Sequence, residues 1–190
     1  MKHEWYNKIV NMKKAFNQAQ KQSFYGTHMP ILSRVVDACS GPILEMGMGL
    51  YSTPLLDLMC YESKRKLVSY DNDPEWFEPN KKWQSDYHEV HFLPGANGSG
   101  VEWDKADINH TFWSVAFLDH KPAIRRKGDA HRLANSALFV LVHDSEPESN
   151  PFFRYTWIYR YFKYRFDYTK CRPNTTVLSN FIPLDFLATP

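Results

Sequence analysis

Four short stretches of the sequence combine glycine, acidic or imidazole groups that could bind a ligand or move a proton. They are Glu45-Met46-Gly47-Met48-Gly49, Asp71, Asp119-His120 and His143-Asp144. Glycines allow a ligand to approach the backbone closely. A carboxylate can accept hydrogen bonds from sugar hydroxyls, and an imidazole can take a proton near neutral pH. Together these groups indicate a site that binds a polar ligand and carries out acid–base chemistry.

The elements that must position these groups are strands, because each stretch ends or follows an apolar run. Strands are predicted over residues 43–46, 66–70, 88–93, 112–118 and 137–142. Helices are predicted between or beside them, over residues 31–39, 54–59, 74–83 and 124–135. Alternating strands and helices predict a parallel sheet covered on both faces. Since the carboxyl ends of parallel strands share one edge, we expect the four stretches to meet there.

The two ends of the chain follow other patterns. Apolar residues spaced by three and four, from Trp5 to Ala19, predict an amphipathic helix. Near the other end a helix is predicted over residues 155–162, followed by an antiparallel hairpin of residues 164–171 and 175–179. Thr53 and Pro54 predict the start of the helix after the first strand, with Thr53 as its N-cap.

Length and composition limit the class of protein. The chain has 190 residues, 43% hydrophobic and 23% charged, with a net charge of +2, which predicts one globular domain. No apolar run is long enough to span a membrane, and no apolar signal core follows Met1. Three cysteines without a C-x-x-C pair argue against a disulfide framework. We therefore expect a cytoplasmic protein that does not bind membranes.

Glu45-Met46-Gly47-Met48-Gly49 resembles the first motif of class I S-adenosylmethionine-dependent methyltransferases, and Asp71 lies where that family keeps a ribose-binding acid. The resemblance covers residues 42–180. It implies an α/β fold, a three-layer Rossmann-like sandwich with a mostly parallel seven-stranded sheet in the order 3-2-1-4-5-7-6, a C-terminal antiparallel hairpin and N-terminal helices. Residues 1–190 would form a single domain, with a helical cap over 1–40 and the core over 41–190. The implied cofactor is S-adenosylmethionine, and the residues expected to bind it are Glu45, Gly47, Gly49, Ser52, Thr53, Asp71, Asn97, Asp119 and His120.

Phe117-Leu118-Asp119-His120-Lys121 resembles the catechol-type O-methyltransferases within that family. The resemblance implies a divalent metal on Asp119, His143 and Asp144, although His143 stands where the subfamily has an acid. Because magnesium prefers oxygen ligands, this histidine favours zinc, manganese or no metal. The resemblance implies that His120 lies beside the cofactor. Lys121 stands one position before the place where that subfamily has its lysine base, and it would take that role.

Without a metal, His143 or His120 would be the general base, oriented by Asp144 or Asp119. The run Arg125-Arg126-Lys127 is interpreted as a solvated helix face rather than a site for an acidic substrate group.

The preferred function is methyl transfer to a hydroxyl of a small-molecule acceptor, and three alternatives stay open. A nicotinamide-dependent dehydrogenase would need a third glycine where Ser52 stands. A nucleic-acid (RNA) methyltransferase or binding protein could use residues 152–172, which hold ten aromatic residues and a net charge of +5. For most of those aromatics we expect packing on the sheet instead. The third alternative is a non-catalytic protein that has kept the methyltransferase fold.

Overall fold

The structure is a computed structural model that describes residues 10, 25–95 and 99–188. The predicted amphipathic helix between Trp5 and Ala19 lies almost entirely outside the described residues, and Asn97 lies outside them as well. Among the residues described, no helix combines the length and the apolar character that crossing a membrane requires.

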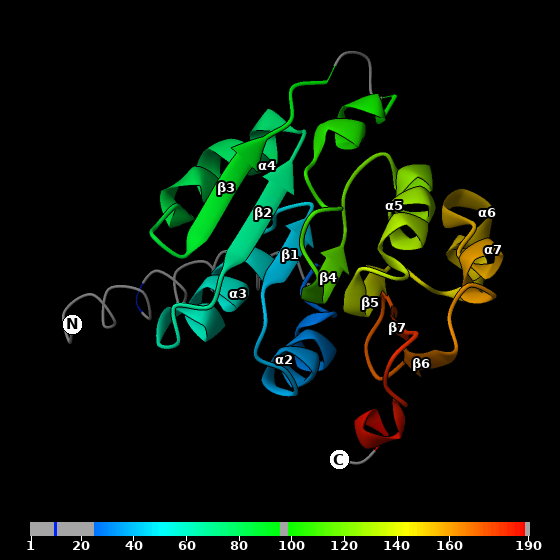
Figure 1. The fold of residues 1–190 in the computed structure, drawn as a ribbon. Helices are drawn as coiled ribbons and strands as arrows, with labels where there is room; N and C mark the ends of the chain where they lie inside the picture. Colours follow the sequence, from blue (N-terminus) through cyan, green and yellow to red (C-terminus); the bar gives the residue numbers. More distant parts are fainter. Residues whose placement is uncertain (1–9, 11–24, 96–98, 189–190) are drawn as a thin grey trace.

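A seven-stranded sheet forms the centre of the molecule (Figure 1), in the predicted order β3-β2-β1-β4-β5-β7-β6. The first five strands pair in parallel, and β7 pairs antiparallel with both β5 and β6. The fold class expected from the sequence is therefore confirmed. The strands are β1 (Ile43–Met46), β2 (Leu67–Asp71), β3 (His88–Phe92), β4 (Trp113–Leu118), β5 (Ala137–His143), β6 (Tyr164–Tyr168) and β7 (Thr175–Ser179).

Helices connect the strands and cover the sheet. The α-helices are α2 (Met29–Asp37), α3 (Ser52–Tyr61), α4 (Pro74–Asn80), α5 (Arg126–Leu133), α6 (Asn150–Phe153) and α7 (Thr156–Tyr159). Short 3-10 turns are η1 (Lys81–Trp83), η2 (Val101–Lys105), η3 (Ala123–Arg125), η4 (Pro147–Ser149) and η5 (Asp185–Leu187).

The helix predicted over 155–162 is shorter, because only α7 (Thr156–Tyr159) forms there, and the short helix α6 before Arg154 was not predicted. Pro151 lies in the first turn of α6, where the missing N–H of a proline costs nothing. Arg154 has a left-handed φ of 55°, which ends that helix. The helix predicted over 124–135 is also shorter, because η3 precedes α5.

Two apolar clusters, one on each face of the sheet, form the core. On one face Leu32, Val36 and Leu56 of α2 and α3 pack with Phe117 and other sheet residues, and residues of η5 join them. On the other face Trp103 of η2 and side chains of α5 and α7 pack against the opposite side of the strands. Burial on both faces explains why the central strands are continuous apolar runs.

The start of α3 differs from the prediction. The helix begins at Ser52, and its N-cap position is Tyr51. Thr53 Oγ1 instead accepts from the backbone N–H of Gly49 at 3.0 Å and donates to the carboxylate of Glu45, with oxygen–oxygen distances of 3.0 and 3.1 Å. The prediction that Thr53 caps the helix was therefore wrong, because Thr53 is the second residue of α3 and its hydroxyl oxygen accepts from Gly49, which precedes the helix.

Candidate active site

A cavity of about 380 Å³ lies at the carboxyl edge of the sheet, within the size range of small-molecule sites. The register explains its position: Met46 pairs with both Tyr70 and Leu118, and Leu118 pairs with Val142, so β1, β2, β4 and β5 end side by side. The predicted site residues that line the cavity are Gly47, Gly49, Ser52, Asp71, Asp119, His120, Lys121, His143 and Asp144. The structure thus brings together groups that are up to 97 positions apart, from Gly47 to Asp144.

Gly47 allows β1 and β4 to end close together. Its φ is +93°, a backbone conformation that residues other than glycine rarely adopt. A Cβ at this position would lie 2.5 Å from the backbone nitrogen of His120. A glycine is therefore required for the loop after β1 to lie against the end of β4.

Asp71 holds the same loop from the β2 side. Its Oδ2 accepts from the backbone N–H of Met48 at 2.7 Å, and its Oδ1 accepts from that of Asp73 at 2.8 Å. Burial raises the pKa of Asp71 to about 6. The carboxylate is thus fixed at the rim of the cavity by two backbone donors.

Glu45 and Thr53 lie beneath the cavity and are not among the residues that line it. Glu45 is fully buried, and its carboxylate accepts from the hydroxyls of Thr53 and Ser69, the latter at 2.6 Å. Burial raises the pKa of Glu45 to about 7. Through Thr53, which accepts from the backbone N–H of Gly49, both residues hold the loop that follows β1.

Arg126 overturns the interpretation of its run as a solvated helix face, because its side chain is only 6% exposed. Its guanidinium reaches Oδ2 of Asp144 at 2.8 Å and Oδ1 of Asp119 at 3.0 Å. It also donates to the backbone carbonyls of His120 and Asp119, at 2.7 and 2.9 Å. The cation is buried because two carboxylates and two carbonyls replace its water shell.

His143 is the imidazole at the centre of the acidic end of the cavity. Its Nδ1 lies 3.3 Å from Oδ1 of Asp119 and 3.5 Å from Oδ1 of Asp144, and its Nε2 lies 3.0 Å from Oγ1 of Thr27. Burial opposes a charged imidazole, but the carboxylate of Asp119 outweighs it, so the pKa of His143 is raised above 6.5. The pKa of Asp119 is lowered, because the charges of His143 and Arg126 outweigh burial.

His28, a residue that the sequence analysis missed, completes this end of the cavity. One ring nitrogen of His28, one oxygen of Asp119 and one ring nitrogen of His143 lie within 4.8 Å of one another. The ring of His28 packs edge-on against His143, with centroids 4.9 Å apart. Nothing in the spacing reveals this residue, because it precedes α2 and lies 115 positions before His143.

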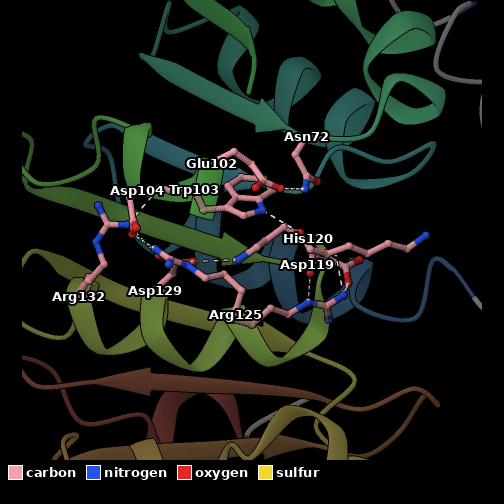
Figure 2. Close-up of polar contacts among 11 residues, drawn as sticks. Asn72, Glu102, Trp103, Asp104, Asp119, His120, Arg125, Asp129 and Arg132 are labelled. Atoms are coloured by element: carbon pink, nitrogen blue, oxygen red, sulfur yellow. Dashed lines mark hydrogen bonds and ion pairs between the residues drawn. The ribbon is translucent and has the colours of Figure 1, made fainter. Parts of the chain in front are cut away.

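His120 borders the cavity but is held by a polar network on the other side (Figure 2). Its Nε2 lies 3.0 Å from Oδ2 of Asp129, and its ring packs on Trp103 with centroids 4.2 Å apart. Asp129 is also paired with Arg125 and Arg132. The buried Nδ1 of His120 has no hydrogen-bond partner among the described residues.

Lys121 lines the cavity next to His120 and is exposed. Its carbonyl accepts from the indole N–H of Trp103 at 2.7 Å. The backbone of this position is therefore fixed by η2, while Lys121 itself is exposed.

The ligand set implied by the catechol-type resemblance, Asp119, His143 and Asp144, is fitted only in part. Asp144 has a left-handed φ of 57° and directs Oδ2 to Arg126. The guanidinium therefore already supplies a positive charge between the two carboxylates. His28 lies on the side of Asp119 and His143 where a third nitrogen or oxygen donor could complete a metal site.

Solved structures with the same fold are methyltransferases. The O-methyltransferase from Bacillus cereus in complex with SAH is 11% identical, covers 90% of each chain and has a TM-score of 0.60. The O-methyltransferase TomG from Streptomyces achromogenes in complex with SAM is 14% identical, covers 90% of each chain and has a TM-score of 0.59. The N-terminal domain of human METTL16 in complex with SAH is 10% identical, covers 82% of this chain and 71% of that chain, and has a TM-score of 0.58.

At the level of sequence, no family model and no curated protein matches the chain. The structural likeness, with the sheet order, shows that the chain has the Rossmann-like fold of class I methyltransferases.

Proposed function

We propose that this protein is an S-adenosylmethionine-dependent methyltransferase that acts on a hydroxyl of a small molecule. One observation carries the proposal: a single cavity joins the loop of residues 47–51 and Asp71, which form a cofactor-type half, to a polar cluster of Asp119, His143 and Asp144. The first part suits a nucleoside-containing cofactor and the second suits activation of a hydroxyl. The solved O-methyltransferases of the same fold support the pairing.

The cofactor half of the cavity fits the group that the resemblance implies. The Asp71 carboxylate lies at the rim, where it would receive the ribose hydroxyls. The backbone of residues 47–52 would surround the methionine part, since Gly47 leaves no Cβ to fill that space. The unpartnered Nδ1 of His120 offers one more polar contact. When bound, S-adenosylmethionine would supply the methyl group.

The acceptor half of the cavity can hold a hydroxyl and take its proton. A hydroxyl oxygen that accepts a methyl group must lose its proton. Asp144 is the proposed acceptor of that proton, because Arg126 holds its Oδ2 while its Oδ1 faces His143. The rigid contacts around Arg126 orient the acceptor, which is the main requirement of methyl transfer.

Isothermal titration calorimetry with S-adenosylmethionine and with S-adenosylhomocysteine tests the cofactor half. We expect both to bind the wild-type protein, and Asp71→Asn to weaken binding about 10- to 100-fold, since hydrogen bonds to a charged group are lost. Asp86→Asn is the matched control, because Asp86 is exposed and precedes β3 at the opposite edge of the sheet. Circular dichroism checks that each variant is folded.

Failure of both compounds to bind the folded wild-type protein would overturn the proposal. If both bind and Asp71→Asn binds as tightly as Asp86→Asn, the cofactor site assignment is wrong. Binding without methyl transfer to any hydroxyl acceptor would favour the non-catalytic alternative.

A further inference from the structure

His28 has an unexplained environment. It is 2% exposed, and neither ring nitrogen has a hydrogen-bond partner among the described residues. A buried polar atom without a partner destabilises the folded state. One of these nitrogens is directed toward Asp119 and His143, within 4.8 Å of their ligand atoms.

The contacts of His143 show that its Nδ1 has to carry a proton or bind a cation at the same place. Thr27 Oγ1 lies 2.7 Å from the carbonyl oxygen of Pro173, which can only accept, so the Thr27 proton points there. Thr27 must then accept from Nε2–H of His143. In the neutral ring this leaves the Nδ1 lone pair facing an oxygen of Asp119 at 3.3 Å. A proton or a metal cation has to lie between them.

A proton on Nδ1 of His143 would satisfy that contact alone and would leave His28 unpartnered. A metal ion within reach of all three groups would satisfy both features at once. The local charge permits it: Asp119 and Asp144 carry two negative charges against one positive charge on Arg126. A divalent cation would therefore enter a site with net negative charge.

We propose that His28, Asp119 and His143 together bind one divalent transition-metal ion. Two imidazoles and one carboxylate suit Zn²⁺, Mn²⁺, Fe²⁺ or Co²⁺, whereas Mg²⁺ and Ca²⁺ prefer oxygen ligands. This donor set differs from the one implied by the resemblance, because His28 replaces Asp144, which is held by Arg126. If the proposed function holds, on which this role rests, the ion would bind the acceptor oxygen and lower its pKa.

The test is metal titration of the full-length protein, with any histidine tag removed and bound metal stripped by EDTA. Co²⁺ is added and its visible d–d absorption is followed, and Zn²⁺ binding is measured by calorimetry. We expect one ion per chain, and His28→Phe to weaken binding about tenfold or more, since one of three protein ligands is lost. The phenyl ring keeps the packing against Phe117.

His91→Phe is the matched control, because His91 lies on β3 and its side chain is 44% exposed. It should bind Co²⁺ like the wild type. His28→Phe should be at least as stable as the metal-free wild type, since it removes two unpartnered nitrogens. Zn²⁺ should raise the melting temperature of the wild type and of His91→Phe, but not of His28→Phe.

No stoichiometric Co²⁺ or Zn²⁺ binding by the folded wild type would overturn the proposal, and so would equal binding by His28→Phe. Calorimetry with S-adenosylhomocysteine on the same preparations separates this result from the proposed function. Metal binding without cofactor binding would keep the metal site and reject the methyltransferase function. Cofactor binding without metal binding would do the reverse.

Discussion

At the scale of single residues, Glu45 shows how burial changes an acid. Its carboxyl group is fully buried and accepts hydrogen bonds from the hydroxyls of Thr53 and Ser69. These hydrogen bonds favour ionisation but do not cancel the loss of water, so the pKa rises from 4.5 to about 7. Burial therefore changes the acidity of this carboxyl group more than its hydrogen bonds do.

This raised pKa predicts how stability depends on pH. The folded state binds the Glu45 proton more tightly than the unfolded state, so the stabilisation is complete below pH 4.5 and is lost as pH rises to about 7. The shift corresponds to about 3 kcal/mol. Glu45→Gln does not titrate, so we expect the variant to gain stability relative to the wild type between pH 5 and pH 8 (as an approximate window).

Urea unfolding at each pH measures this difference, and Glu62→Gln, an exposed position at the end of α3, is the control. Wild-type and Glu45→Gln stability curves that run parallel across this window would show that Glu45 titrates normally.

At the scale of elements, the unit of β1, loop and α3 places the cofactor-type loop against the end of β4. The sequence pattern predicted this strand–loop–helix unit, and the structure shows why residue 47 must be glycine. Gly47 combines a left-handed backbone with a close approach to His120. The loop can therefore pack against Asp119 and His120 only if residue 47 has no Cβ.

Gly47→Ala should be strongly destabilising, by about 2–4 kcal/mol, since it adds backbone strain to a collision with the backbone of Asp119 and His120 after β4. Binding of S-adenosylhomocysteine should weaken as well. Gly128→Ala in α5 is the matched control: its Cβ would meet nothing within 4 Å, so alanine should stabilise that helix by about 0.5–1 kcal/mol. Urea unfolding and calorimetry measure both effects, and equal stability of the two variants would contradict the role given to Gly47.

At the scale of the whole molecule, charge and aromatic residues concentrate toward the C-terminal end of the chain. Tyr155, Phe162 and Tyr168 are buried, as expected for packing on the sheet, while Phe152, Trp157 and Tyr161 are exposed. Several cations of this segment are engaged locally: Arg165 pairs with Asp167, and Arg172 pairs with Glu148. Arg160 lies over the rings of Trp157 and Tyr161.

This arrangement predicts weak binding of nucleic acid. Cations that are paired with neighbouring acids release few counterions, and aromatic faces covered by Arg160 are not open platforms for bases. In gel-shift titrations with single-stranded RNA at physiological salt, we expect no discrete complex at low micromolar protein. A tight, salt-sensitive complex that Trp157→Ala abolishes would instead favour the nucleic-acid alternative.

The sequence by itself determined the sheet and the location of the site. Apolar runs separated by helical patterns specify parallel strands, and the order of the sheet agreed with the methyltransferase resemblance. Because strand ends share an edge, the clustering of Asp71, Asp119 and His143 could also be predicted. These features depend on local pattern and register, which a chain encodes in consecutive residues.

Only the tertiary structure decided which charges meet. Arg126 looked like a solvated residue in sequence, and His28 carried no signal at all, yet both contact the group of Asp119 and His143. The physical reason is that burial and pairing depend on distance in space, and these residues come from elements far apart in the chain. Thr53 illustrates the same point: its local pattern predicted a helix cap, but its hydroxyl donates to the buried carboxylate of Glu45 on β1.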